Sequence, residues 1–96
     1  MVMTKYSRAD NNADEIVDVL VQLGCRVTRL TNVGGGVPDL LVCTGSRDLC
    51  LIEVKQPGQN LRPNQVVFAK TWPVWVVHTV DEAIRAYNHT IRGVKP

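Results

Sequence analysis

The sequence lacks the features that would place the protein in a membrane or outside the cell. No hydrophobic run approaches the roughly 20 residues that a helix needs to cross a bilayer. The start, MVMTK, lacks the apolar stretch of a secretion signal. The three cysteines, an odd number without CxxC spacing, lie in apolar segments and are expected to be reduced core thiols. These absences predict a cytoplasmic protein that does not bind membranes.

An excess of charge of one sign is also missing. The chain has 11 basic and 9 acidic residues, a net charge of +2. This total does not indicate nucleic-acid binding, because only clustering of charge on one surface would do so. The default expectation for the basic residues is scattered, solvated charge. The candidates for a rim that follows DNA phosphates are Lys5, Arg8, Arg26, Arg29, Arg62 and Lys70.

Glycine and histidine give no nucleotide-binding or zinc motif. The glycine run 34–36 lacks the spacing of a Walker or dinucleotide-binding loop and leads into a predicted strand. It allows either a close approach of backbone to DNA or a tight bend. His78 and His89 have no partner at metal-ligand spacing, so structural roles are expected. Trp72 and Trp75 are expected to pack in the core or at a dimer interface rather than to stack on bases.

The chain contains one continuous α/β pattern. Its 96 residues, 45% of them hydrophobic, suit a single domain spanning 1–96 whose modest core favours self-association. Periodicity and turn residues predict the order helix, three strands, helix, strand, helix. The expected ranges are 12–23, 25–30, 39–44, 49–55, 63–71 and 74–77, with a last helix after the capping-box sequence 79–82. Asn12 is the predicted N-cap of the first helix, with Glu15 in the reciprocal position.

The strands over 39–44 and 49–55 are expected to form an antiparallel hairpin at the centre of the sheet. The short polar segment 45–48 joins them. Both strands are apolar almost throughout, which predicts that both faces of the sheet are covered. We therefore predict an α/β fold with a mixed sheet flanked by helices.

The ends of this hairpin carry the residues that indicate chemistry. The hairpin returns the chain to its starting point, so Asp39 is expected near Glu53. Strand residues two apart share a face, which places Lys55 beside Glu53. Asp39 shares that face only if the numbers of paired residues add up to an even value, which requires a turn of odd length or a bulge beside Pro38.

Two carboxylates that converge at the end of a buried sheet repel each other unless a cation lies between them. Hard oxygen ligands select Mg²⁺ or Mn²⁺, and the main-chain carbonyl of Val54 could add a third ligand beside Asp39 and Glu53. The cation would acidify a bound water and neutralise charge on a phosphate. Lys55 would position that water or stabilise the phosphorane. The alternative is a strand pair that merely ends in charged residues at the surface.

These segments resemble a known nuclease family. The sequences VPDLLV (37–42) and LIEVK (51–55) are similar to the PD-(D/E)XK phosphodiesterase motif. With the preceding Gly36 and the later Gln65, they resemble a stand-alone virus-type replication-repair nuclease (VRR-NUC) domain, a minimal form found in phages and prophages. The resemblance covers most of the chain. It implies a restriction-endonuclease-like core, DNA cleavage with Mg²⁺ or Mn²⁺, a homodimer, kinship with Holliday-junction resolvases, and catalytic roles for Asp39, Glu53 and Lys55.

Three further positions follow from the resemblance. The family often places an acidic metal ligand on the first helix, and Glu15 is the nearest match; the capping role is its alternative. Gln65 matches a family glutamine that supports the site, against the alternative of an exposed helix glutamine. Arg62 stands before Pro63, where many relatives have Ser or Thr. Capping is expected to be poorer there, and a phosphate contact becomes available.

The leading functional prediction is a metal-dependent DNA endonuclease. The alternative is a DNA-binding or assembly module that keeps the fold but cleaves little. The enzyme is favoured because a purely structural module has no need of Asp39, Glu53 and Lys55 together.

Overall fold

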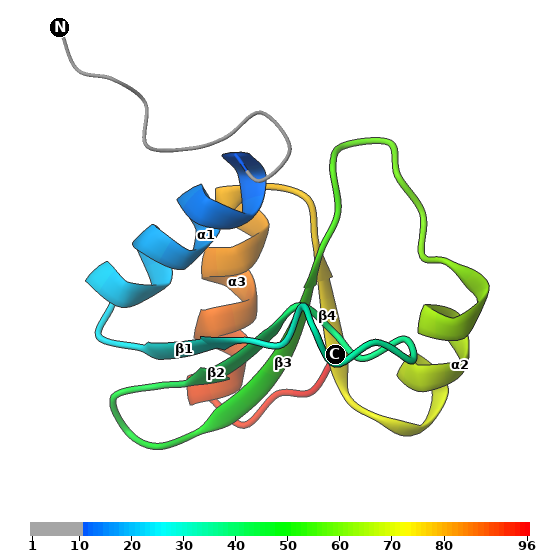
Figure 1. Cartoon of the computed structure of the whole chain (residues 1–96). Helices are drawn as coiled ribbons and strands as arrows, with labels where there is room; N and C mark the ends of the chain where they lie inside the picture. Colours follow the sequence, from blue (N-terminus) through cyan, green and yellow to red (C-terminus); the bar gives the residue numbers. More distant parts are fainter. Residues whose placement is uncertain (1–10) are drawn as a thin grey trace, which may run out of the picture.

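A four-stranded mixed sheet lies at the centre of the computed structural model, which describes residues 11–96 (Figure 1). The predicted order of helices and strands is confirmed. The elements are α1 (Asn11–Gln22), β1 (Arg26–Arg29), β2 (Leu40–Cys43), β3 (Leu49–Val54), α2 (Pro63–Thr71), β4 (Val74–Val77) and α3 (Val80–Ile91). Within the described residues, no helix is both long and apolar enough to span a membrane.

The strands follow one another in the order β1-β2-β3-β4. The first three pair antiparallel, and β4 lies parallel to β3 because α2 provides the crossover. Leu40 pairs with Ile52 across the hairpin. The turn between β2 and β3 spans 44–48 and is one residue longer than predicted, because Thr44 belongs to it. Its N–H donates to the Asp48 carbonyl (2.8 Å), and its hydroxyl accepts from the Asp48 N–H (3.0 Å). The odd length extends the register so that Asp39 stands opposite Glu53, on the same face.

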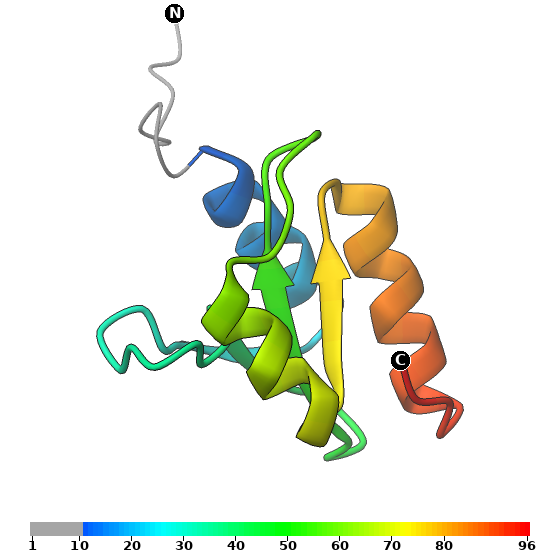
Figure 2. The same ribbon diagram turned by 90° about the vertical axis from the view of Figure 1, so that its right-hand side faces the viewer.

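Helices α1 and α3 pack side by side against one face of the sheet (Figures 1 and 2). Both are amphipathic and direct their apolar sides at the strands. The largest fully buried side chains of this core are Ile16, Leu20, Leu40, Val42, Ile52 and Val77. This layer holds the ends of β2 and β3, and therefore the predicted site, in place.

The opposite face of the sheet is only partly covered. Helix α2 lies on this side (Figure 2), so the fold class is confirmed, but α2 has no buried residue. Leu49 is 67% exposed and Leu41 is 37% exposed. The expectation that both strand faces are covered is therefore wrong for the hairpin end of the sheet. An apolar run shows that a face avoids water but does not show that the same chain covers it.

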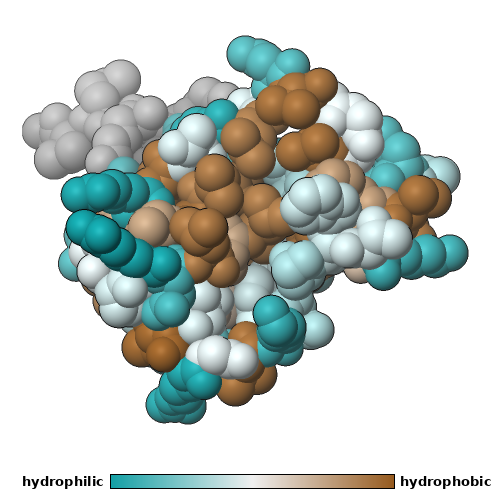
Figure 3. All heavy atoms as spheres, turned by 90° about the horizontal axis from the view of Figure 1, so that it is seen from below, coloured by the Kyte–Doolittle hydropathy of each residue, from teal (hydrophilic) through white to brown (hydrophobic). Residues whose placement is uncertain are grey.

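This uncovered region forms an apolar groove of about 450 Å³. Figure 3 views the molecule from below and shows hydrophobic side chains gathered on its surface. The apolar groove is lined chiefly by Leu41, Leu49, Leu51, Trp72, Pro73 and Trp75. Trp75 also packs against the core, whereas Trp72 is 55% exposed and stacks on Phe68.

The starts of α1 and α3 differ in detail from the predictions. Helix α1 begins at Asn11, so the predicted N-cap at Asn12 is wrong, and Asn12 lies within the first turn. At α3 the Thr79 hydroxyl accepts from the Glu82 N–H (3.1 Å), as the capping box predicts. The reciprocal contact of Glu82 is made to the N–H of His78, one residue earlier than a capping box requires.

Candidate active site

Asp39 is fixed between its two neighbouring strands. Its carbonyl accepts from the Leu30 N–H (2.7 Å), which continues the β1–β2 ladder beyond Arg29. Its carboxylate reaches across to β3, where Oδ2 accepts from the Val54 N–H (2.8 Å). Because Pro38 before it is buried, the start of β2 is held firmly and the carboxylate has a defined position beside Glu53.

Glu53 is a carboxylate in an unusually dry position, with 3% of its surface exposed. Its Oε2 atom accepts from Gln65 Nε2 (2.9 Å) and lies 3.4 Å from Lys55 Nζ. Its Oε1 atom is buried and has no hydrogen-bond partner among the described residues. Burial raises the pKa of the Glu53 carboxyl, and the negative charge of Asp39 raises it further, while Lys55 acts in the opposite direction.

Lys55 directly follows β3 on the same face as Glu53, and 8% of it is exposed. Its N–H donates to the Val77 carbonyl (2.9 Å), so the backbone at Lys55 is tied to β4. A buried lysine needs a counter-charge, and here Glu53 provides it. The three predicted catalytic residues therefore lie together at one end of the β2–β3 hairpin.

A cleft of about 490 Å³ opens onto these three residues. Polar groups make up most of its wall, in contrast to the apolar groove. The other residues that line it come from the glycine run, the segment after β3 and the start of α2, and include Gly34, Gly35, Gly36, Gln59, Asn60, Arg62, Asn64 and Gln65.

Gly36 brings the glycine run against α2. Its φ is +82°, and a Cβ at this position would overlap the carbonyl oxygen of Asn64. Any other residue would therefore push the start of α2 away from the site. Of the two roles predicted for the glycine run, Gly36 serves a close approach, but the neighbour is α2 of the same chain.

Gln65 lies at the point where α2 meets the site. Its Oε1 accepts from the Arg62 N–H (2.8 Å), and its Nε2 donates to Glu53. The side chain of Arg62 makes no capping hydrogen bond, as predicted from its lack of an acceptor. Gln65 thus takes the place expected of a supporting residue, and Arg62 remains available at the edge of the cleft.

The donor set suits a hard divalent cation. Asp39 and Glu53 offer carboxylate oxygens, and Glu53 Oε1 is a buried acceptor without a partner in the described part of the chain. Within residues 11–96, no group of three His, Cys, Asp or Glu side chains comes together, so the carbonyl of Val54 or water oxygens would have to complete the shell. Oxygen ligands of this kind fit Mg²⁺ or Mn²⁺ better than zinc.

Glu15 is not brought to this group. It is exposed on α1 and does not line the cleft, so its role as a ligand stays a prediction. Of the predicted basic rim, Arg62 lines the cleft and Arg29 is paired with Asp14 (2.6 Å). Lys5 and Arg8 lie outside the described residues.

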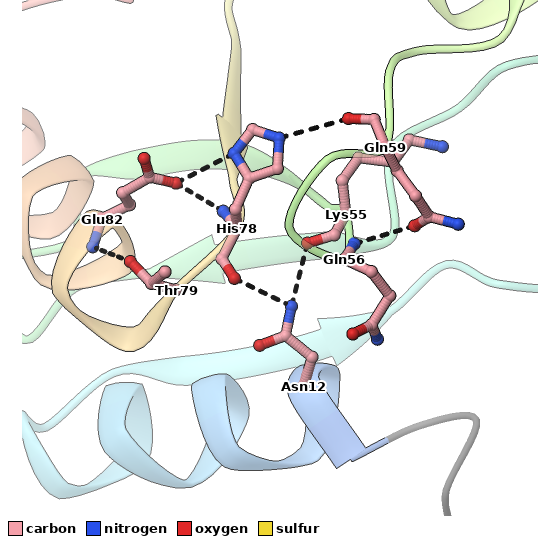
Figure 4. A network of polar contacts seen from close by, with 7 residues as sticks. All are labelled: Asn12, Lys55, Gln56, Gln59, His78, Thr79 and Glu82. Atoms are coloured by element: carbon pink, nitrogen blue, oxygen red, sulfur yellow. Dashed lines mark hydrogen bonds and ion pairs between the residues drawn. The ribbon is translucent and has the colours of Figure 1, made fainter.

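The sequence interpretation missed one residue that contacts the backbone of the site at Lys55. Asn12 Nδ2 donates to the carbonyls of Lys55 (2.9 Å) and His78 (3.1 Å) (Figure 4). Its position near a helix start suggested only a cap. These bonds span 43 and 66 residues of sequence, and no local pattern encodes them.

Comparisons with known proteins agree with this geometry. The model of the VRR-NUC domain family matches residues 2–71. A solved structure described as a VRR_NUC domain superposes with a TM-score of 0.65 at 24% sequence identity, over 80% of this chain and 90% of that one. This likeness concerns the fold. No curated protein matches the chain.

Proposed function

The chain belongs to the VRR-NUC family and is a nuclease of the PD-(D/E)XK type, and we propose that it is a DNA endonuclease that depends on Mg²⁺ or Mn²⁺. The observation that carries the proposal is the buried Glu53 carboxylate, whose Oε1 atom has no partner in the described residues and whose neighbour is Asp39. A cation is the group that makes two converging carboxylates favourable at neutral pH.

The residues of the site have different roles in the proposed phosphodiester hydrolysis. A cation held by Asp39, Glu53 and the Val54 carbonyl would lower the pKa of a water molecule and neutralise charge on the phosphate. Lys55 Nζ, beside Glu53, donates hydrogen bonds to the phosphate oxygens as their charge increases in the transition state. Gln65 holds the Glu53 carboxylate in one orientation.

A cleavage assay tests this function directly. Supercoiled plasmid and linear duplex should be cut with Mg²⁺ or Mn²⁺ and left intact with chelator. Asp39→Asn is the matched control, because an amide can still accept from the Val54 N–H but contributes no charge to the ligand set. Metal-independent cleavage would refute the proposed chemistry. Binding without cleavage in any DNA form would support the alternative function, a DNA-binding module.

We further propose that the enzyme acts as a homodimer, with a second copy covering the apolar groove. The exposed Leu49 and Trp72 both line this groove. Soluble monomers seldom leave a large apolar patch exposed to water. Two-fold pairing is the commonest closed assembly and would relate two sites as the strands of a duplex are related. The groove lies at the opposite end of β3 from Glu53, so a partner seated there leaves the cleft open.

Selectivity for branched DNA, including four-way junctions, is a proposal that rests on this dimer. Two sites of fixed separation suit a substrate that needs two symmetric cuts. Cleavage rates on duplex, flap, splayed-arm and four-way-junction substrates of equal length measure the preference. Equal rates on all four substrates would exclude structure selectivity and leave a general endonuclease.

A cytoplasmic location is also proposed. Cys25, Cys43 and Cys50 are free thiols. This is the state expected of thiols in a reducing compartment.

A further inference from the structure

Asn12 lies where the parallel strands β3 and β4 separate (Figure 4). The ladder between them runs one step past β3, because the Lys55 N–H donates to the Val77 carbonyl (2.9 Å). Beyond this bond the two strands separate. β3 leads into the loop that follows Lys55, and β4 leads into α3. The carbonyls of Lys55 and His78 lie at this open end of the ladder.

The side chain of Asn12 closes the open end. Its Nδ2 atom donates to Lys55 (2.9 Å) and to His78 (3.1 Å). A primary amide carries two N–H groups on one nitrogen, so one group is available for each carbonyl. A single residue of α1 thereby ties together the ends of both strands.

The His78 side of this contact is itself fixed. Glu82 accepts from the N–H of His78 (2.5 Å) and lies 3.0 Å from the ring Nδ1. On the other side, the ring Nε2 lies 3.4 Å from the carbonyl of Gln59, which belongs to the turn after Lys55 and lines the cleft. The polar contacts in Figure 4 therefore connect α1, α3 and the edge of the cleft.

We propose that Asn12 is a positioning residue for Lys55. The inference rests on the proposed function, in which Lys55 Nζ contacts the reacting phosphate. The N–H of Lys55 is bound to Val77 and its carbonyl to Asn12, so the backbone is held on both sides of its Cα. The buried side chain then reaches Glu53 from a fixed base. Without the amide, two partly buried carbonyls lose a donor, and the end of β3 relaxes away from the phosphate.

The test compares three substitutions that change the side-chain amide of Asn12. Asn12→Leu removes both donors at similar volume, and Asn12→Asp replaces them with a carboxylate that faces two carbonyls. Asn12→Gln keeps both donors one methylene further from the backbone. Gln22→Leu is the matched control, because it removes an exposed amide from the other end of the same helix.

Asn12→Asp separates the proposed role from a role in helix stability. An acidic residue in the first turn favours a helix, so α1 itself should gain from the change. If Asn12 positions Lys55, the single-turnover cleavage rate should still fall by about tenfold or more, since misplacement by about 1 Å can cost about a hundredfold. The dissociation constant for DNA, measured in Ca²⁺, should change by less than about threefold.

The expected pattern is a loss of rate in Asn12→Leu and Asn12→Asp at unchanged DNA affinity, with partial recovery in Asn12→Gln. Wild-type rates in both of the first two variants would overturn the proposal. A parallel loss of rate, affinity and Tm in all three would also overturn it, because Asn12 would then be merely structural. If Asn12→Leu does not fold, Asn12→Asp and Asn12→Gln decide.

A spectroscopic measurement separates this inference from the proposed function. The ¹³C carbonyl shifts of Lys55 and His78 report whether each group accepts a hydrogen bond, and they need no cleavage. Both should move in Asn12→Leu and Asn12→Asp where these variants fold, move less in Asn12→Gln, and stay in place in Gln22→Leu. If the wild type cleaved no DNA but the substitutions at Asn12 moved these shifts, the proposed function would be wrong. The hydrogen bonds from Asn12 to Lys55 and His78 would still be confirmed. If neither shift moved, the positioning role would be overturned whatever the cleavage result.

Discussion

One face of β3 and of Lys55, which directly follows it, has an apolar half and a charged half. In these two halves the usual relation between polarity and burial is reversed. Leu49 and Leu51, at the hairpin end, face the apolar groove, and Leu49 is mostly exposed. Glu53 and Lys55, four residues further on, are both buried. Leucine is normally among the buried residues, and glutamate and lysine are rarely buried unless paired.

The comparison shows that each half is incomplete in a different way. The apolar half leaves a surface in water that a second protein copy would cover. The charged half keeps the Glu53 carboxylate and Lys55 out of water, next to the half-buried Asp39, at a cost to folding. A cation and a phosphate would be favourable partners there. Changes at one half should therefore affect assembly, and changes at the other should affect chemistry.

The largest expected effect belongs to the charged half. Asp39→Asn should lower cleavage by at least about a hundredfold, because even groups that only support metal ligands typically contribute 10- to 100-fold. The fold should persist, since Asn can accept from the Val54 N–H, and DNA should bind at least as tightly because a negative charge facing phosphate is gone. Plasmid nicking and circular dichroism measure the two effects. Near-normal cleavage at ordinary Mg²⁺ concentration would remove Asp39 from the ligand set.

Lys55→Ala should lower the single-turnover rate by about a hundredfold, comparable to the loss of an oxyanion donor. DNA affinity should change little, because the contact strengthens mainly in the transition state. Arg85→Ala, an exposed cation on α3, is the control for a simple loss of positive charge. If affinity fell and the single-turnover rate did not, Lys55 would be an ordinary phosphate contact.

The apolar half should respond in assembly. Leu49→Lys should weaken the homodimer by about thirtyfold or more, the effect of losing about 2 kcal/mol at an interface hot spot. The Tm of the monomer should hardly change, because Leu49 is already exposed in the single chain. Val21→Lys, at an exposed apolar residue of α1, is the matched control. A wild type that light scattering finds monomeric at micromolar concentration, with and without DNA, would refute the dimer.

The smallest effect concerns stability and pH in the charged half. The pKa of Glu53 is raised above its ordinary value of 4.5, so the folded chain holds this proton more tightly than the unfolded chain. The stability that this gives is fully present below pH 4.5 and is lost as pH rises through the folded pKa. Glu82 acts in the opposite sense, because hydrogen bonds from His78 lower its pKa.

Urea unfolding in chelator and in Mg²⁺ isolates the Glu53 contribution. The gain in stability from Mg²⁺ should grow as pH rises through the pKa of Glu53, since the cation binds the ionised carboxylate. In Asp39→Asn, both the loss of stability in chelator and the gain from Mg²⁺ should be smaller. A gain from Mg²⁺ that is the same at every pH would argue against Glu53 as the ligand.

The parts predicted from sequence are those that local patterns encode. The order of elements follows from periodicity, and the meeting of Asp39 with Glu53 and Lys55 follows from a hairpin and its register. Gln65 could be placed only through the family resemblance. The orientation of α2 relative to β3, which brings Gln65 to Glu53, is not encoded by neighbouring residues.

The parts that were missed depend on distant contacts. Asn12 looks like a cap in its own segment, and its partners lie far away in sequence. The exposure of the leucines in the apolar groove was missed, because leucines in a strand look the same whether or not the rest of the chain covers them. Trp72 and Trp75, which line the same groove, are the part of it for which the sequence predicts packing in the core or at a dimer interface. For Asn12 and for the leucines alike, the deciding interaction is absent from the neighbouring residues.

The five-residue turn between β2 and β3 makes the alignment of the site a matter of parity. Side chains alternate between faces, so moving one strand by a single residue would send Asp39 to the face opposite Glu53, although the turn lies at the other end of the hairpin. Insertions or deletions of two residues in this turn preserve the alignment, and those of one preserve it only if the turn absorbs them as a bulge. Length variation in the turn is therefore constrained to even steps by chemistry that takes place four residue pairs away.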